Sequence, residues 1–411
     1  MAPPKLLIDA TPLRTHSGLR GIGRFVRDLL HGLDETKSEW EHAISINALA
    51  TLDASGGFQV SGDLAAVAEE AFAARGTAGP WIMGARRNGS ARAALASGSA
   101  AIHFTEALGL PGEFPMPRVV TCYDLIPLRM PRHYGQSFGR AFFFRRRCLR
   151  DYGRADRVVT ISEKTGREVQ ELLNLPQSMI DVVPLGLSLK RQRGKTTEDQ
   201  ATLGALGLGG RRYVLYVGYS DYRKNVEGMI AALAEARRQI DVDLVWAGAL
   251  PPSEQRRIMK LAQRTGVGNH VKLLGFVNDD RLDSLYRMAV AHLFISRLEG
   301  FGFTVTEAMA AGCPVIVGAG SGSDEVAGAA AIRVNPEDFV GAGRHIVELA
   351  NDPHLSAKLV AAGTERVKLF DRCRMARDYV ASYARTIGLS DLVDAIPTRA
   401  GAGRPSPAAA Y

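Results

Sequence analysis

The chain has 411 residues, of which 46% are hydrophobic and 23% are charged. This composition is typical of a globular protein, and the length suggests two or three domains. Lysine and arginine outnumber aspartate and glutamate by 51 to 43. The excess favours polyanionic partners, such as a nucleotide diphosphate, nucleic acid or an anionic membrane surface, and does not choose among them.

Cysteine usage and hydropathy bear on the compartment. The four cysteines lie far apart and form no CxxC pair, which argues against a disulfide framework or a zinc site and favours a reducing compartment. No apolar run approaches the roughly 18 residues of a membrane-spanning helix. The apolar start at Leu6–Ile8 is too short for a signal peptide and predicts a buried strand instead. We therefore expect a cytoplasmic protein.

In the first half of the chain, short apolar runs alternate with longer amphipathic segments, the pattern of a parallel sheet flanked by helices. Five runs predict strands: Lys5–Ile8, Ala101–Phe104, Arg118–Thr121, Arg157–Ile161 and Ile180–Val183. The Ala- and Gly-rich stretch from 49 to 99 gives no signal. We expect one Rossmann-like α/β domain over residues 1–186.

The alternation breaks near Pro184, and the polar, basic stretch that follows predicts a linker over residues 187–210. A second series of strands is then predicted: Tyr213–Val217, Val242–Ala247, Val271–Leu274, Ala291–Ile295 and Pro314–Val317. Apolar residues at helical spacing predict a helix over Asn225–Gln239. We expect a second Rossmann-like domain over 211–373, a helix over 374–390 and a disordered tail over 391–411.

The most informative stretch is residues 299–312, EGFGFTVTEAMAAG, which follows an apolar strand and opens a helix. A glycine turn before a helix exposes backbone amides at the positive end of the helix dipole, which suits a phosphate. Glu299 precedes the turn and Glu307 lies inside the helix, so that both could face one cleft. On spacing alone, another interpretation is equally good: Glu299 is a solvated loop acid and Glu307 is an ordinary acid in the first turns of a helix.

The E-x7-E spacing within this run resembles that of retaining glycosyltransferases of family four, in their mannosyltransferase-like branch. Further matches cover nearly the whole chain: IDATPL and RGIGRF near the N-terminus, TCYDLIPLRMP at 121–131, VVTISE at 158–163, IDVVPLGL at 180–187, YVGYSDYRKN at 216–225, LLGFV at 273–277 and SGSDEVAG at 321–328. The resemblance implies the GT-B fold, in which two Rossmann-like domains face each other across a cleft and the C-terminal helix returns to the N-terminal domain.

The resemblance also implies roles for residues of the second domain. Glu307 would bind the ribose hydroxyls of a donor nucleotide, and Glu299 would contact the transferred sugar. Lys224 and Arg223 would neutralise the diphosphate, because fixed cations and helix-terminal amides stabilise a leaving group without a metal. The remaining donor-binding residues implied are Gly302, Phe303, Thr304, Gly218, Tyr219, Phe276 and Val277.

Two positions depart from the family pattern. Tyr219 follows Gly218 where many relatives carry an arginine, so one of the usual two phosphate cations is either missing or supplied by Arg223. Tyr123 precedes Asp124 where many relatives carry a histidine that touches the donor sugar, so sugar recognition should differ. Asp124 is a candidate for the N-domain side of the site, or else an N-cap or turn residue.

Other motifs in the sequence are less specific. The loop from 16 to 24 contains Gly21 and Gly23, which would let the backbone approach the diphosphate or, alternatively, make a tight strand–helix turn. Asp241 and Asp243 match the metal-binding DxD of another glycosyltransferase fold only superficially, and we predict no metal.

The segment from 138 to 150 mixes phenylalanines with a run of arginines. Contact with an anionic membrane surface or with a lipid-pyrophosphate acceptor is one interpretation. The other is a core-packing helix with one solvated basic face. Nucleic-acid binding is not expected, because no base-reading motif accompanies the charge.

These observations predict a retaining, metal-independent hexosyltransferase that needs no cofactor. The resemblance favours mannose from GDP-mannose as the donor, with UDP-linked hexoses and dTDP-rhamnose as alternatives. A glycan or a polyprenyl-pyrophosphate-linked acceptor is expected, at the inner face of the cytoplasmic membrane. The competing hypotheses keep the fold but not the transfer: a nucleotide-sugar epimerase or hydrolase, or a non-catalytic nucleotide-sugar-binding protein.

Overall fold

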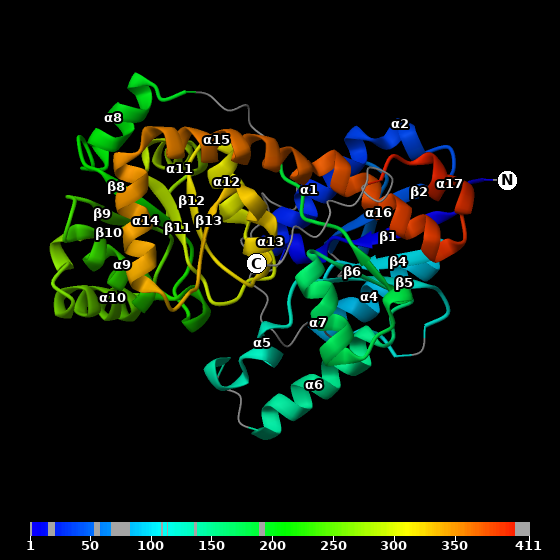
Figure 1. Ribbon diagram of the computed structural model, residues 1–411. Coiled ribbons are helices and arrows are strands. Elements are labelled where there is room, and N and C mark those ends of the chain that lie inside the picture. The colour runs from blue at the N-terminus through cyan, green and yellow to red at the C-terminus, as the bar shows by residue number, and fades with distance from the viewer. Residues whose placement is uncertain are drawn as a thin grey trace. The chain divides into compact units, whose positions relative to one another are not determined.

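The structure is a computed structural model of the full chain (Figure 1). Contacts divide the chain into two compact units, one formed by Met1–Ser188 together with Phe370–Tyr411 and the other by Leu189–Leu369. The residues that the structure describes are 2–14, 21–52, 58–66, 83–107, 110–112, 114–134, 138–188 and 194–398.

The first unit is built on a seven-stranded sheet with the order β3-β2-β1-β4-β5-β6-β7. Only the pair of β2 and β3 is antiparallel. The strands are β1 (Lys5–Asp9), β2 (Ser45–Leu52), β3 (Phe58–Ser61), β4 (Ala101–Phe104), β5 (Arg118–Cys122), β6 (Arg157–Thr160) and β7 (Ile180–Val182). All five predicted strands are present, and β2 and β3 are additional. The central strands are buried along their length, as expected for parallel strands covered on both faces.

Helices cover this sheet, and the last ones come from the C-terminal end of the chain. They are α1 (Gly21–Glu35), α2 (Lys37–Trp40), α4 (Met83–Ala96), α5 (Ile126–Arg129), α6 (Phe138–Tyr152), α7 (Glu163–Leu173), α16 (Arg372–Ile387) and α17 (Ser390–Ala395). In Figure 1 the red helices α16 and α17 lie among the blue N-terminal elements. The C-terminal helix therefore returns to the N-terminal domain, as expected.

Close packing and a buried polar network hold α16 in place. A Cβ atom on Gly32 of α1 would lie 2.4 Å from the carbonyl oxygen of Arg372. Buried His103 of β4 hydrogen-bonds through Nδ1 to the Tyr383 hydroxyl and through Nε2 to Thr121 Oγ1, both at 2.8 Å. Tyr379 also contacts the Thr121 hydroxyl, at 2.9 Å. Burial lowers the pKa of His103 to about 3, so the imidazole is neutral at physiological pH.

The second unit contains a six-stranded, fully parallel sheet with the order β10-β9-β8-β11-β12-β13. The strands are β8 (Tyr213–Val217), β9 (Asp243–Ala247), β10 (Val271–Gly275), β11 (Ala291–Phe294), β12 (Val315–Gly318) and β13 (Ile332–Val334). The five predicted strands are confirmed to within one residue at each end, and β13 is additional. The helices of the second unit are α8 (Thr197–Ala205), α9 (Val226–Arg237), α10 (Pro252–Arg264), α11 (Asp279–Met288), α12 (Phe303–Ala310), α13 (Gly322–Ala327), α14 (Phe339–Asn351) and α15 (Pro353–Val367).

Two segments differ from the sequence-based expectation. The predicted linker 187–210 contains helix α8, which Thr196 and Asp199 open with a capping box. Buried Asp199 pairs with Arg287 of α11 at 2.6 Å, so this helix is an integral part of the second unit. The predicted tail 391–411 begins inside helix α17, where Leu392 is buried; residues from 399 onward lie outside the described ranges.

In both sheets, the first strands along the chain are added toward one edge and the later strands toward the other edge. When the strands of a unit are numbered along the chain, the order is 3-2-1-4-5-6-7 in the first sheet and 3-2-1-4-5-6 in the second, with the reversal between β1 and β4 in the first and between β8 and β11 in the second. Open α/β sheets bind ligands in the crevice at such a switch point, beyond the carboxyl ends of the strands. Over the residues described, no helix is both long and apolar enough to cross a membrane.

Candidate functional site

The loops that follow β8 and β11 meet at the switch point of the second unit. After β8, Asp221 opens a short 3-10 helix (Tyr222–Lys224), and its Oδ1 accepts from the Arg223 amide at 3.0 Å. After β11, the chain runs through Glu299 to Gly302, where α12 begins. The backbone joins the two loops, since the Arg297 amide donates to the Arg223 carbonyl at 2.7 Å.

A charged cluster of Arg223, Lys224 and Glu299 occupies this switch point. Lys224 Nζ lies 2.6 Å from Glu299 Oε1, and Arg223 Nη1 donates to Glu299 Oε2. The carboxylate is only 7% exposed and the lysine 12%. Burial by itself would raise the pKa of Glu299, but the two cations lower it below its ordinary value. The site thus contains a buried carboxylate that stays ionised because two cations face it.

Lys224 is itself desolvated. Its Nζ lies 4.9 Å from the centroid of the Phe294 ring. Burial lowers the pKa of Lys224, and the charge of Glu299 opposes that shift. A cation in such a setting interacts strongly with an incoming anion, because the surrounding dielectric is low.

Asn225, which the sequence analysis did not single out, fixes the position of the lysine. Its backbone is left-handed, with φ 58°, and its side chain caps α9 by accepting from the Gly228 amide at 3.2 Å. The buried Nδ2 donates to the carbonyls of Ile295 at 3.0 Å and Pro336 at 2.6 Å. The residue therefore ties the β8–α9 turn to the end of β11. An asparagine directly before an apolar-periodic helix is an N-cap signal that could have identified it.

The glycine turn before α12 requires its glycines. Gly302 is left-handed with φ 108°, and a Cβ atom there would lie 2.8 Å from the Ser323 Cβ. A Cβ atom on Gly322 of α13 would lie 2.1 Å from the Gly300 carbonyl oxygen. This close packing directs the first turn of α12, with Phe303 and Thr304, to the carboxyl edge of the sheet. The amides of such a first turn form the positive end of a helix dipole.

Glu307 lies one turn further along α12 and in different surroundings from Glu299. It is half-buried and accepts a hydrogen bond from the Tyr286 hydroxyl of α11 at 3.0 Å. The Thr304 hydroxyl is paired with buried His292 of β11, at 3.2 Å from Nε2. The two glutamates therefore lie in different surroundings. Glu299, before the glycine turn, faces two cations, and Glu307, inside α12, faces the Tyr286 hydroxyl.

The remaining predicted residues of this unit lie at the same edge of the sheet. The Gly218 carbonyl accepts from the Trp246 indole at 3.0 Å, and the Tyr219 carbonyl accepts from the Tyr216 hydroxyl at 2.8 Å. Phe276 follows β10 and is 82% exposed, while the neighbouring Val277 is half-buried. An exposed aromatic ring at this edge is available to stack on a planar base.

In the first unit, Tyr123 and Asp124 follow β5. The Tyr123 hydroxyl donates to the Thr105 carbonyl at 2.7 Å, and its ring meets Phe25 edge-on at 5.5 Å. Asp124 accepts from the Ile126 amide at 3.1 Å at the start of α5, the turn role considered as its alternative. Asp9, at the end of β1, was not singled out; it is buried and accepts from Thr11.

The prediction that Gly21 and Gly23 lie in a loop was wrong. Helix α1 already begins at Gly21, which is exposed, while Gly23 is buried two residues further along, in the first turn. The helix starts early because Phe25, Leu29 and Leu33 supply a buried stripe at helical spacing. The rest of that motif, residues 15–20, falls outside the described part of the chain.

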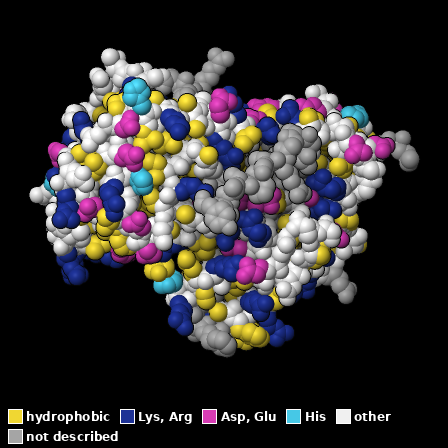
Figure 2. All heavy atoms as spheres, viewed as in Figure 1, with side chains coloured by type: hydrophobic (Ala, Val, Ile, Leu, Met, Phe, Trp, Pro, Cys, Tyr) yellow, Lys and Arg dark blue, Asp and Glu magenta, His cyan; other side chains and the backbone are white. Residues whose placement is uncertain are grey.

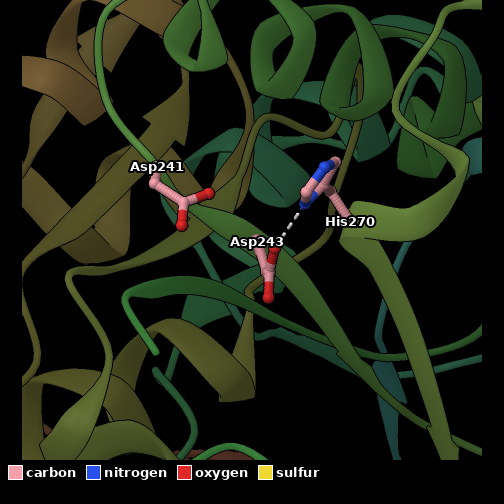
Figure 3. Close-up of side chains that lie close together, drawn as sticks. All are labelled: Asp241, Asp243 and His270. Atoms are coloured by element: carbon pink, nitrogen blue, oxygen red, sulfur yellow. Dashed lines mark hydrogen bonds and ion pairs between the residues drawn. The ribbon is translucent and has the colours of Figure 1, made fainter. Parts of the chain in front are cut away.

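The DxD pair lies at the opposite, amino edge of the second sheet. Asp241, Asp243 and His270 converge there, as Figure 3 shows. Asp243 Oδ1 lies 3.0 Å from His270 Nδ1, and its other oxygen accepts from Arg211. Asp241 pairs with Arg237 at 2.7 Å. Both carboxylates also face cations, so these residues form an ion-pair network.

Comparison with known proteins gives a consistent assignment. Residues 204–366 match the family "Glycosyl transferases group 1", and residues 79–191 match "Glycosyltransferase Family 4". The chain is 25% identical, over 95% of its length, to the serotype-specific mannosyltransferase WbdA of Escherichia coli, of which it spans about half (49%). It is 29% identical, over 54% of its length and 60% of the relative, to a GDP-mannose-dependent alpha-(1-6)-phosphatidylinositol monomannoside mannosyltransferase of Mycobacterium tuberculosis.

The fold matches solved structures as well. The sucrose-phosphate synthase of Thermosynechococcus elongatus superposes with a TM-score of 0.71, over 94% of this chain and 100% of that one, at 21% identity. The two family matches follow one another along the chain and agree with the two Rossmann-like units and with the motif at 299–312. The mannosyltransferase relatives and the GT-B structural neighbours agree with them as well. The chain therefore carries a domain of each of these two glycosyltransferase families, one in each unit, on the GT-B fold of its structural neighbours.

Proposed function

We propose that the protein is a retaining, metal-independent mannosyltransferase that uses GDP-mannose to extend a glycan or a lipid-linked oligosaccharide in surface polysaccharide synthesis. The observation that carries this proposal is the buried cluster of Lys224, Arg223 and Glu299 beside the first turn of α12. The cluster combines two fixed cations with helix-terminal amides at a switch point, the features that bind a diphosphate.

The cluster supports charge stabilisation by the protein alone. When the glycosidic bond breaks, negative charge develops on the departing diphosphate. Lys224 and Arg223 are preorganised by Glu299, so little reorganisation is needed as that charge grows. Glu299, held by both cations, is placed to accept hydrogen bonds from sugar hydroxyls. Burial strengthens each of these interactions.

Retention follows if both bond changes occur on one face of the sugar. The acceptor oxygen forms a bond to the anomeric carbon on the side from which the diphosphate leaves. The acceptor proton passes to the departing phosphate oxygen, so that no protein base is demanded. Asp124, which accepts from the Ile126 amide in the turn before α5, then has a positioning role toward the acceptor side.

The identity of the donor rests on the relatives. The names of two similar proteins specify mannosyl transfer, and one of them specifies GDP-mannose. Glu307 beside Tyr286 would bind the ribose, and exposed Phe276 would stack on the base. We also propose that the reaction takes place at the cytoplasmic face of the membrane, where the enzyme would meet the lipid-linked form of the acceptor.

A thermal-shift screen without added metal tests the donor. GDP-mannose should raise the melting temperature of the protein, since a ligand that binds only the folded state stabilises it. UDP-glucose, UDP-GlcNAc and dTDP-rhamnose should give small shifts. A larger shift from one of these would replace the donor, and no shift from any would contradict the proposal. Donor consumption without acceptor would instead identify a hydrolase.

The stereochemistry is tested with the donor that binds. Transfer to a mannose oligosaccharide should give a product with the anomeric configuration of the donor, read by proton NMR. Chelator should leave the rate unchanged. An inverted product, or loss of activity with chelator, would overturn the mechanism.

A further inference from the structure

Helix α6 (Phe138–Tyr152) has two faces of opposite character. Its inner face packs on the first unit through Cys148 and Tyr152, which are buried, and Phe144, which is partly buried. Its outer face exposes Phe142 (50%) and Phe143 (72%). Five arginines on the helix are also exposed: Arg140, Arg145, Arg146, Arg147 and Arg150.

Helical spacing places the aromatic and basic side chains together. Phe143, Arg146, Arg147 and Arg150 recur at intervals of three and four residues and so share one side of the helix. The guanidinium of Arg146 lies 5.7 Å from the centroid of the Phe142 ring, and the two phenylalanine rings meet edge-on at 5.9 Å. Two adjacent phenylalanines with this exposure form a paired apolar patch, which is typical of an interaction surface.

The outer face presents no carboxylate of its own. The single acid of the helix, Asp151, is buried, and it is already paired with Arg150 at 2.9 Å and Arg147 at 3.6 Å. The neighbouring 3-10 helix (Pro131–Tyr134) adds exposed Arg132 and His133. Figure 2 shows basic and hydrophobic side chains side by side at the lower end of the molecule, where Figure 1 places α5 and α6.

We propose that this face of α6 docks the protein on the surface of an anionic phospholipid bilayer. The two phenylalanines would enter the boundary between headgroups and acyl chains, and the arginines would bind lipid phosphates. Charge complementarity selects an anionic partner. The exposed phenylalanine pair then favours a bilayer over nucleic acid, because a bilayer offers apolar depth directly beneath its charged layer. The inference rests on the proposed function for its purpose, the approach to a lipid-linked acceptor.

Vesicle flotation of the full-length protein tests the proposal. The protein should float with vesicles of phosphatidylcholine and phosphatidylglycerol, and not with phosphatidylcholine alone. Raising the salt concentration should weaken binding, because exposed charges are screened. Phe142→Ser with Phe143→Ser should lower the partition coefficient by about tenfold or more. Arg140→Gln with Arg146→Gln should also lower it, and should lessen its salt dependence.

A matched control lies in the same unit. Leu95 and Arg92 of α4 are an exposed apolar residue and an exposed arginine three positions apart. Leu95→Ser with Arg92→Gln should float like the unchanged protein. All variants should keep their melting temperatures to within a few degrees, which shows that they fold.

Three outcomes would overturn the proposal: equal flotation with neutral vesicles, no flotation at low salt, or equal losses in the α4 and α6 variants. Failure of the transferase assignment gives a different pattern. Flotation that depends on α6, without a thermal shift from any nucleotide sugar, would contradict the proposed function and leave membrane docking intact. A thermal shift with GDP-mannose and no flotation would contradict membrane docking and leave the proposed function intact.

Discussion

The two units share the order of their first six strands, yet the ends of their central strands carry different chemistry. In the second unit, the loops after β8 and β11 hold two cations against a buried carboxylate. In the first unit, the described contacts at the corresponding strand ends include no ion pair: the Thr105 hydroxyl donates to the Asp9 carbonyl at 2.7 Å, the Tyr123 hydroxyl donates to the Thr105 carbonyl, and the buried Asp9 carboxylate accepts from Thr11. The topology provides an equivalent crevice in each unit, and the side chains decide which crevice suits a diphosphate.

The largest effect should come from removing the lysine of the charged crevice. Lys224→Ala should lower kcat/KM for the donor by about 100-fold or more, because a preorganised cation at a developing charge contributes roughly 3 kcal/mol. It also leaves Glu299 with one cation fewer. Steady-state kinetics measure the effect. Lys260→Ala, at an exposed lysine of α10, is the control, and equal kinetics for both variants would contradict the charged-crevice assignment.

The next effect concerns the residue that positions this lysine. Asn225 and Asn174 both have left-handed backbones, with φ 58° and 52°. Asn225→Gly keeps the backbone but leaves the buried Ile295 carbonyl and the partly buried Pro336 carbonyl without their donor, so we expect a loss of about 2–3 kcal/mol in the free energy of unfolding. Asn174 is the exposed C-cap of α7, and Asn174→Gly should change that free energy by less than about 0.5 kcal/mol.

Urea denaturation measures both asparagine variants. Donor KM should rise with Asn225→Gly and stay constant with Asn174→Gly, because only the former bears on Lys224. Equal stability changes in the two variants would show that backbone conformation, rather than the bonds to Ile295 and Pro336, determines the role of Asn225.

A third effect sharpens the comparison between the units through their buried histidines. His103 of β4 and His292 of β11 occupy equivalent central strands, and burial lowers the pKa of each to about 3. Since the unfolded pKa is near 6.5, each histidine takes up a proton on unfolding once the pH falls below that value. The free energy of unfolding should therefore decrease by about 1.4 kcal/mol per pH unit for each histidine as the pH falls from about 6 toward 3.

Urea denaturation between pH 7 and pH 5 checks this dependence. His103→Gln should reduce the slope by up to about 1.4 kcal/mol per pH unit, because it removes the proton uptake of one buried histidine. Comparing the variant with the unchanged protein cancels the carboxylates that both retain. An unchanged slope would mean that His103 is not buried in neutral form.

The smallest effect is expected in the crevice of the first unit. Tyr123→Phe removes one hydrogen bond to the Thr105 carbonyl and should cost about 1 kcal/mol in the free energy of unfolding. The thermal shift with GDP-mannose should stay close to that of the unchanged protein. A loss of donor binding as large as that in Lys224→Ala would break the comparison and make Tyr123 a donor ligand.

Local patterns in the sequence determined much of this protein. Short apolar runs predicted ten strands, because parallel strands covered on both faces must be apolar along their length. The run 299–312 predicted a glycine turn before a helix, and the left-handed backbone of Gly302 shows why glycine is needed there. Strand β2 escaped because SINALATL mixes polar and small residues, and β13 because it has three residues, one of them an exposed arginine.

Only the tertiary structure decided which side chains meet. Lys224 and Glu299 are separated by 75 positions, and their contact depends on β8 and β11 being neighbours in the sheet. The same holds for Asn225, whose two acceptors lie on distant segments. It also holds for Asp243, which pairs with His270 and Arg211. Sequence periodicity reports the burial of each residue, but pairing between distant charges is fixed by strand order and loop packing.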